Sequence, residues 1–177
     1  MPEIAPIIEQ LRRARVGLES AARNIPAELW QAPPRPGAWS AAEVIAHLTM
    51  VEERIALGAS QLPQAPPTRV SVWRRLHVPP RFAEWRGIRA KTPIPLDRSF
   101  LVEKEAMLKR LAAARQRTLA LLEQNVGRDL RAYRWPHPFF GSLNYYQWFR
   151  MIAHHEVRHT KQLLEISAAF RLPSKKE

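Results

Sequence analysis

The sequence predicts an all-α protein, a four-helix bundle, from three observations. Four long segments carry apolar residues at spacings of three and four, the pattern of an amphipathic helix with one buried face. Stretches rich in proline and glycine separate these segments. No part of the sequence shows a convincing alternation of apolar and polar residues, the pattern expected of a strand. The length of 177 residues suits one domain. We therefore expect residues 1–177 to form a single bundle around one common axis.

The first helix is expected from about residue 3 to residue 23, because an apolar stripe runs from Ile7 to Ala21. A proline-rich loop follows, which cannot continue a helix. The second helix is expected to begin after Ser40 and to continue to about Ser60.

The start of the second helix is the clearest local signal in the chain. The Ser40 hydroxyl can accept a hydrogen bond from the Glu43 amide while the Glu43 carboxylate accepts one from the Ser40 amide. Trp39 can pack on Val44 as a hydrophobic staple. These four residues predict a capping box that fixes where the helix begins.

A long Pro/Arg-rich connection, residues 61–96, is expected between the second and third helices. Residues 62–95 contain seven prolines and several arginines, so regular helix is limited to a short one from Val70 to His77. Its aromatic residues indicate a segment that packs over the domain. We expect Arg74 and Arg75 to lie at the rim of a pocket.

The third and fourth helices are expected from sequence signals at both ends. Asp97 is the predicted N-cap of the third helix, which runs to about Gln124. Ser142 is the predicted N-cap of the fourth, which runs from about Leu143 to Phe170. Residues 171–177 are expected to be a flexible tail.

Composition excludes several classes of protein. With no cysteine, the chain has no disulfide scaffold, thiolate zinc site, iron–sulfur cluster or cysteine nucleophile. The N-terminal segment lacks the pattern of a signal peptide, and no apolar run approaches the roughly 18 residues of a membrane-spanning helix. We therefore expect a cytoplasmic protein with no membrane partner.

The net charge of +12 has two interpretations. Clustered cations bind phosphates with release of counterions, which favours a nucleic-acid partner. The basic residues are mostly arginine in a chain rich in proline and alanine, a composition that GC-rich coding sequence produces without any polyanion. Since no nucleic-acid-binding motif is present, we expect DNA to be a poor ligand.

Two histidines lie within the apolar stripe of the fourth helix. His155 and His159 are one turn apart, the arrangement that lets two imidazoles bind one metal ion. His154 points away from that face and is expected to be exposed. His47, at the edge of the buried stripe of the second helix, can supply a third ligand and leave a fourth position for water or substrate. The competing interpretation is that these are satisfied core histidines.

The chain resembles the DinB/YfiT-like metalloenzymes over about residues 5 to 170. The resemblance is carried by Trp39-Ser40 leading to Glu43-Val44-Ile45-Ala46-His47-Leu48, and by His137-Pro138-x-x-Gly141-x-Leu143 leading to His155-x-x-x-His159-x-x-Gln162. It implies a four-helix bundle that holds a divalent metal, usually nickel or zinc. Carried over residue by residue, the ligands are His47, His155 and His159.

The resemblance also implies a range of activities. Some relatives are thiol-dependent transferases or isomerases that use a low-molecular-weight thiol, and others have been called metal-dependent hydrolases. The basic connection between the second and third helices is longer than the family pattern suggests, which puts a shared substrate in doubt.

Three further residues are candidates around this site. Glu52, one turn beyond His47, is a candidate to orient a ligand or act as general base, although an exposed helical glutamate is the favoured interpretation. Gln162 is expected behind His159, and His137 at the mouth of the pocket.

The leading hypothesis is a metal-dependent enzyme acting on small, anionic molecules, a thiol-dependent S-transferase or a hydrolase. The alternative is a non-catalytic basic bundle, either a stress-related DNA-associated protein or one that forms a homodimer through its helix faces.

Overall fold

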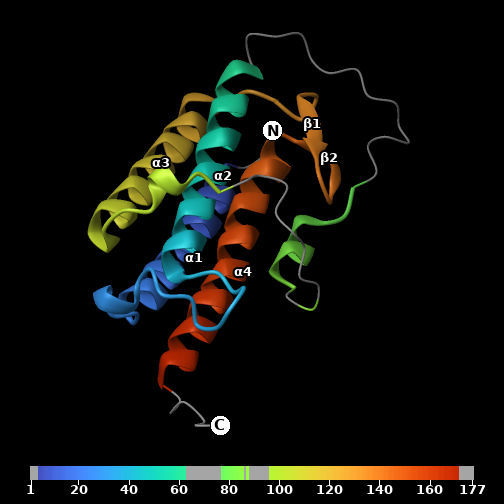
Figure 1. Ribbon diagram of the computed structural model, residues 1–177. Helices are drawn as coiled ribbons and strands as arrows, with labels where there is room; N and C mark the ends of the chain where they lie inside the picture. The colour runs from blue at the N-terminus through green and yellow to red at the C-terminus, as the bar shows by residue number, and fades with distance from the viewer. Residues whose placement is uncertain (1–3, 63–76, 86, 88–95, 172–177) are drawn as a thin grey trace.

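The computed structural model describes residues 4–62, 77–85, 87 and 96–171. Four long helices form a bundle (Figure 1), which confirms the predicted architecture. They are α1 (Ala5–Arg23), α2 (Ala41–Gln61), α3 (Lys104–Gln124) and α4 (Tyr145–Arg171). None of the described helices has the length and hydropathy that a membrane crossing requires.

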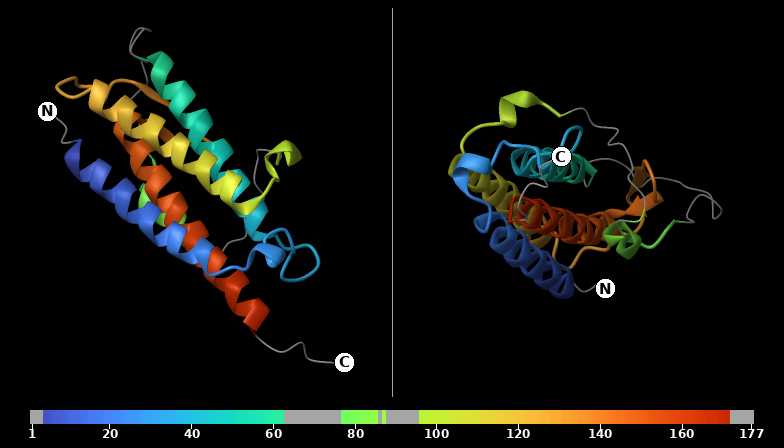
Figure 2. Two further views of the ribbon diagram at one scale, coloured as in Figure 1. Left: turned by 90° about the vertical axis from the view of Figure 1, so that its left-hand side faces the viewer. Right: turned by 60° about the horizontal axis from the view of Figure 1, so that its bottom comes forward.

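The bundle consists of two helix pairs. α1 packs chiefly against α4, and α2 packs chiefly against α3, whereas α2 and α4 have fewer contacts and α1 and α3 fewer still. The right-hand view in Figure 2 shows α4 between α1 and α2. Any site built from both α2 and α4 therefore lies at the junction of the two pairs.

The start of α2 is formed by the predicted capping box. The Ser40 hydroxyl accepts from the Glu43 amide at 3.2 Å, and the Glu43 carboxylate accepts from the Ser40 amide at 2.8 Å. The Ala42 amide donates to the Trp30 carbonyl at 3.0 Å. These bonds supply partners for donors that the first turn of a helix leaves unpaired.

The connection between α2 and α3 is described only in part. Residues 77–85 include a short 3₁₀ helix, η4 (Pro80–Glu84), which packs against α4. The predicted helix from Val70 to His77 lies outside the described residues except for His77, whose backbone forms a β-bridge with Gly141. Arg74 and Arg75 also lie outside them.

The third helix starts later than predicted, so the assignment of Asp97 as its N-cap is wrong. The Asp97 carboxylate accepts from the Ser99 amide two residues on, at 2.9 Å. That bond lies at the start of a short 3₁₀ helix, η5 (Arg98–Phe100). Glu103 takes the N-cap position of α3 in an extended conformation.

The segment before α4 is a β-hairpin, which the sequence analysis did not predict. β1 (Arg134–His137) pairs antiparallel with β2 (Gly141–Asn144). Gly141 has a φ of 76°, a backbone conformation that residues other than glycine rarely adopt. The strands have only four residues each, too few to produce a recognisable alternation.

Ser142 lies in this hairpin, so its predicted role as N-cap is also wrong. The cap of α4 is Asn144, whose side chain accepts from the Gln147 amide at 2.9 Å. The Gln147 side chain accepts from the Asn144 amide at 2.8 Å. The two residues form a capping box in which amide side chains replace serine and glutamate.

A layer of charge crosses the middle of the core. The apolar residues form two clusters, one containing Leu11 and Phe149 and the other containing Leu18 and Leu163. Along every helix of the bundle, one buried charged residue separates the stretches that belong to these two clusters. These residues are Arg15, Glu52, Arg115 and Glu156, and we call them the Arg–Glu network.

Candidate metal centre

Three histidine side chains meet between α2 and α4. His47 comes from α2, and His155 and His159 come from successive turns of α4. Nε2 of His155 lies 3.3 Å from Nε2 of His47 and 3.0 Å from Nε2 of His159. One nitrogen of each ring lies within 4.8 Å of the others. The fold therefore brings together the three residues that the sequence singled out.

The chemistry of these contacts suits a cation. A neutral imidazole has one N–H donor and one nitrogen lone pair. The Nδ1–H of His159 donates to Oε1 of Gln162 at 2.9 Å, which leaves the lone pair of His159 on Nε2, facing His155. Facing ring nitrogens are held together by a proton on one of them or by a cation between them. Three imidazoles around a divalent ion also leave a further position for water or substrate.

Trp39 forms a wall of the cluster. Its ring lies 5.1 Å from that of His47, and it stacks on His159 with 6.5 Å between ring centroids and 11° between planes. It also packs against the apolar cluster that contains Val44. Because Trp39 immediately precedes the cap of α2, the local structure that starts this helix also covers two of the histidines.

Two of the three rings, His47 and His155, are uncharged at physiological pH. Burial lowers the pKa of His47 to about 4. Burial also holds the pKa of His155 well below its usual value, and the neighbouring His159 and His47 lower it further. A metal ion binds neutral imidazole, so these rings need not lose a proton before they act as ligands.

Glu52 does not join the histidines, and its favoured interpretation as an exposed residue is wrong. It is only 3% exposed. Its carboxylate accepts from Arg15 at 3.1 Å and from Arg115 at 2.7 Å. A carboxylate held by two guanidinium groups inside the core is engaged structurally and is a poor general base.

His154 differs from its expected exposed position. Its side chain is 18% exposed and lies 2.6 Å from Glu84 of η4. Its other ring nitrogen lies 3.0 Å from the Gln10 side chain. The connection between α2 and α3 folds back onto α4 here, and this long-range contact covers His154 on the side away from the cluster.

His137 lies in β1, against the start of α4. Its Nδ1 accepts from the amides of Phe139 and Phe140 at 3.0 and 3.3 Å, so the ring proton is on Nε2. The ring lies 5.0 Å from that of Trp148, two turns before His155, and burial lowers its pKa to about 4. The structure thus places a neutral N–H donor near the hairpin. Its predicted place at a pocket rim stays a prediction.

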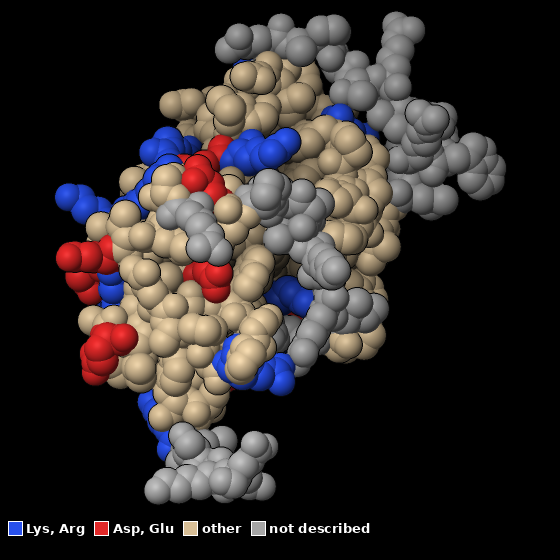
Figure 3. Space-filling view, in the orientation of Figure 1, with Lys and Arg blue, Asp and Glu red and all other residues tan. Residues whose placement is uncertain are grey.

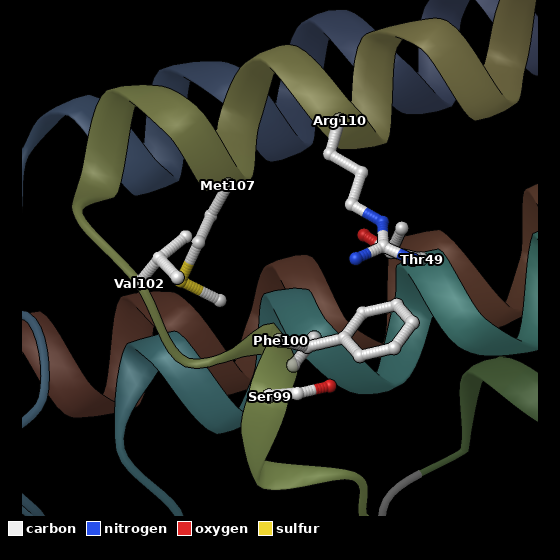
Figure 4. Close-up of a pocket in the computed structure, with 7 residues that line it drawn as sticks. Thr49, Ser99, Phe100, Val102, Met107 and Arg110 are labelled. Carbon is white, nitrogen blue, oxygen red and sulfur yellow. The ribbon is translucent and has the colours of Figure 1, made fainter.

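Two other hollows are poorer sites. A cavity of about 60 Å³ lies between α2 and α3 and has room for about two water molecules. Figure 4 shows Arg110 extending over the Phe100 ring beside Thr49. A larger hollow, about 490 Å³, lies between α1 and α3 and reaches Arg15 and Arg115. Those guanidinium groups are already bonded to carboxylate and carbonyl oxygens.

The sequence analysis missed the Arg–Glu network, although the sequence contains a signal for it. Leu-x-x-Ala-Arg occurs at Leu11 to Arg15 and again at Leu111 to Arg115. In both cases the arginine adjoins the buried stripe of its helix. A search for internal repeats would have paired these two segments and drawn attention to buried arginines at equivalent positions.

The fold and its histidine cluster define a class of four-helix bundle with a candidate metal centre. The model of the DinB superfamily matches residues 10–163, and the chain belongs to this superfamily. No curated protein matches the chain significantly.

Two solved structures share the bundle. TT2238, described as a four-helix bundle protein, is 26% identical, with a TM-score of 0.60 and coverage of 92% of this chain and 99% of its own. YfiT from Bacillus subtilis, described as a probable metal-dependent hydrolase with an unusual four-helix bundle topology, is 16% identical, with a TM-score of 0.65 and coverage of 96% and 89%. At that identity, the likeness to YfiT shows the fold alone.

Proposed function

We propose that this protein is a cytoplasmic, metal-dependent enzyme acting on small molecules, with His47, His155 and His159 as ligands of one nickel or zinc ion. The observation that carries the proposal is the convergence of three imidazole nitrogens from two helices. Ring nitrogens of satisfied core histidines pair with carbonyl, carboxylate or hydroxyl groups, as Nδ1 of His159 does with Gln162. Nε2 of His155 instead faces Nε2 of His47 and of His159.

The surrounding side chains support a reactive centre. A divalent ion supplies Lewis acidity, which activates a water molecule for hydrolysis or a thiol for S-transfer. Gln162 fixes the tautomer and orientation of His159, as partners behind metal ligands commonly do. Trp39 excludes water from one side of the cluster. His137 can donate its Nε2–H to a substrate lying along α4 toward the hairpin.

The proposal extends to a small, anionic substrate and a low-molecular-weight thiol as co-substrate. The net charge of +12 attracts anions to the protein, and arginine binds the carboxylates of such thiols in bidentate fashion. Arg74 and Arg75 are proposed to take part in this attraction.

The non-catalytic alternative has less support. On the face in Figure 3, Lys and Arg side chains lie beside Asp and Glu side chains. Glu53 pairs with Arg110 at 3.4 Å and with Arg117 at 2.7 Å, joining α2 to α3. Mixed charges of this kind suit a solvated surface better than a phosphate-binding one.

Metal analysis of untagged protein tests the proposal. The wild-type protein is expected to hold about one equivalent of nickel or zinc when loaded and desalted, and a variant with all three histidines replaced by alanine is expected to hold none. His154→Ala is the control and should keep its metal. Stoichiometric metal in the triple variant would show that the ligands are misassigned.

Two activity assays on the metal-loaded protein then distinguish S-transfer from hydrolysis. Thiol-dependent consumption of chlorodinitrobenzene supports S-transfer, whereas thiol-independent hydrolysis of nitrophenyl acetate supports a hydrolase. Tight DNA binding at physiological salt by a protein that holds no metal would instead favour the non-catalytic alternative.

A further inference from the structure

The three histidines are attached to different halves of the bundle. His47 is on α2, which packs chiefly against α3, and the other two are on α4, which packs chiefly against α1. The separation of the ligands therefore depends on how one helix pair is placed against the other. A shift of one pair along the bundle axis would change it directly.

The Arg–Glu network spans this same junction. Arg15 of α1 donates to Glu52 of α2 at 3.1 Å, and Arg115 of α3 donates to Glu156 of α4 at 2.9 Å. Each arginine also holds the glutamate of its own pair, at 2.7 Å in both cases. Each carboxylate is thus tied to both helix pairs.

Backbone contacts follow the same pattern. Arg15 Nη1 donates to the Leu111 carbonyl of α3 at 3.0 Å, and Arg115 Nη1 donates to the Leu11 carbonyl of α1. Each arginine therefore donates to the backbone carbonyl that lies four residues before the other arginine. If α1 is exchanged with α3, and α2 with α4, each of the bonds named above is mapped onto another of them. This internal twofold arrangement fixes both the axial position and the rotation of the helix pairs.

The network lies close to the histidines along the chain. Glu156 directly follows His155 in α4, and Glu52 is five residues after His47 in α2. A metal site tolerates errors of only about 0.2 Å in its ligand distances. A movement of α2 or α4 that is small compared with the size of the network is therefore large compared with the error that a metal centre tolerates.

We infer that Arg15, Glu52, Arg115 and Glu156 are positioning residues of the metal centre, which lock the two helix pairs in the register that brings His47 to His155 and His159. The inference rests on the proposed metal site. Replacing a buried ion pair by apolar side chains of similar volume is often neutral for stability, but apolar contacts lack the directional bonds that a fork-shaped guanidinium group makes to a carboxylate.

A charge-preserving variant tests this inference. Arg15→Lys/Arg115→Lys keeps both positive charges, but a lysine cannot bridge two carboxylates and a carbonyl with fixed geometry. The matched control is Arg110→Lys/Arg117→Lys, in which two arginines of α3 that pair with the partly exposed Glu53 are changed in the same way. Zinc affinity is measured by competition with a chromophoric chelator, and ligand geometry by the absorption spectrum of the cobalt-loaded protein.

The network variant is expected to bind zinc about 10–100-fold more weakly than the wild type, the usual effect of removing support behind metal ligands. Its cobalt spectrum should change, whereas both readouts should be unchanged in the control. Circular dichroism verifies folding, and Arg115→Lys alone replaces the double variant if that one is unfolded.

A folded network variant with wild-type zinc affinity and cobalt spectrum would overturn the inference. Failure of the wild-type protein to bind either metal would be a different result, because it contradicts the metal centre itself.

Discussion

Two buried polar clusters lie next to each other on α2 and α4, and they differ in how their polar atoms are paired. In the Arg–Glu network, two cations face two anions and the guanidinium groups also bond backbone carbonyls. In the histidine cluster, three imidazole rings face one another, and Gln162 accepts a hydrogen bond from the far side of the His159 ring.

This difference indicates what each cluster is for. The network satisfies its own charges, so it has a structural task and little capacity to bind anything else. In the histidine cluster Nε2 of His155 faces Nε2 of His47 and of His159, an arrangement that a cation between the rings would complete. Burial has opposite consequences in the two places: it requires the charges of the network to stay paired, and it keeps His47 and His155 neutral.

The largest expected effect is on stability, when the pairing in the network is broken. Glu52→Ala leaves Arg15 and Arg115 in the core with less negative charge than they need, so the free energy of unfolding should fall by about 3–5 kcal/mol. Urea denaturation followed by circular dichroism measures it. Glu53→Ala is the control, because an exposed pair contributes only about 0–1 kcal/mol. Equal losses in the two variants would contradict the distinction between a buried network and a solvated surface.

The second effect depends on the histidines alone. At free zinc of about 100 times the dissociation constant, a ligand that binds only the folded state adds about 2.7 kcal/mol to its stability. Removing metal from the wild-type protein with a chelator should therefore lower its thermal midpoint. The same treatment should leave His155→Ala unchanged, and a chelator effect of equal size in that variant would show that the metal binds elsewhere.

The third effect is smaller, because it concerns the residue behind a ligand. Gln162→Ala removes the oxygen that accepts from Nδ1 of His159, which frees the ring to rotate and to change its tautomer. Metal affinity should fall about 10–100-fold. Isothermal titration with zinc measures this, with Gln116→Ala on α3 as the control. An unchanged affinity would indicate that packing against Trp39 is sufficient to orient His159.

Local signals made the helices and the histidine set predictable from sequence. The spacing of His155 and His159 within an apolar stripe places them on one face of α4, and the capping box at Ser40 predicts where α2 begins and therefore that His47 lies on its second turn. Both depend on neighbours within one or two turns of helix, which sequence periodicity captures.

Long-range pairing explains what could not be predicted. Glu52 resembles an exposed helical residue until Arg15 and Arg115 reach it from other helices. His154 is covered by Glu84, a residue of the connection between α2 and α3 that is distant in sequence. The hairpin before α4 is too short to show an alternation, and one of its strands contains Pro136, which is uncommon inside sheets.

The smallest expected effect concerns the local cap, and it tests whether local and long-range determinants of the metal centre can be separated. Ser40 is 2% exposed, and its hydroxyl accepts from the Glu43 amide. Ser40→Ala should therefore lower the free energy of unfolding by about 0.5–2 kcal/mol, the usual cost of losing an N-cap. Ser20→Ala, at an exposed position within α1, is the control and should be neutral or slightly stabilising, because alanine favours helix. The zinc affinity of Ser40→Ala should remain close to that of the wild type, because the Arg–Glu network still holds α2 against α4 when the first turn of α2 frays. A large loss of zinc affinity in Ser40→Ala, with little change in stability, would show that the cap and the adjoining Trp39 position His47, and that the network does not.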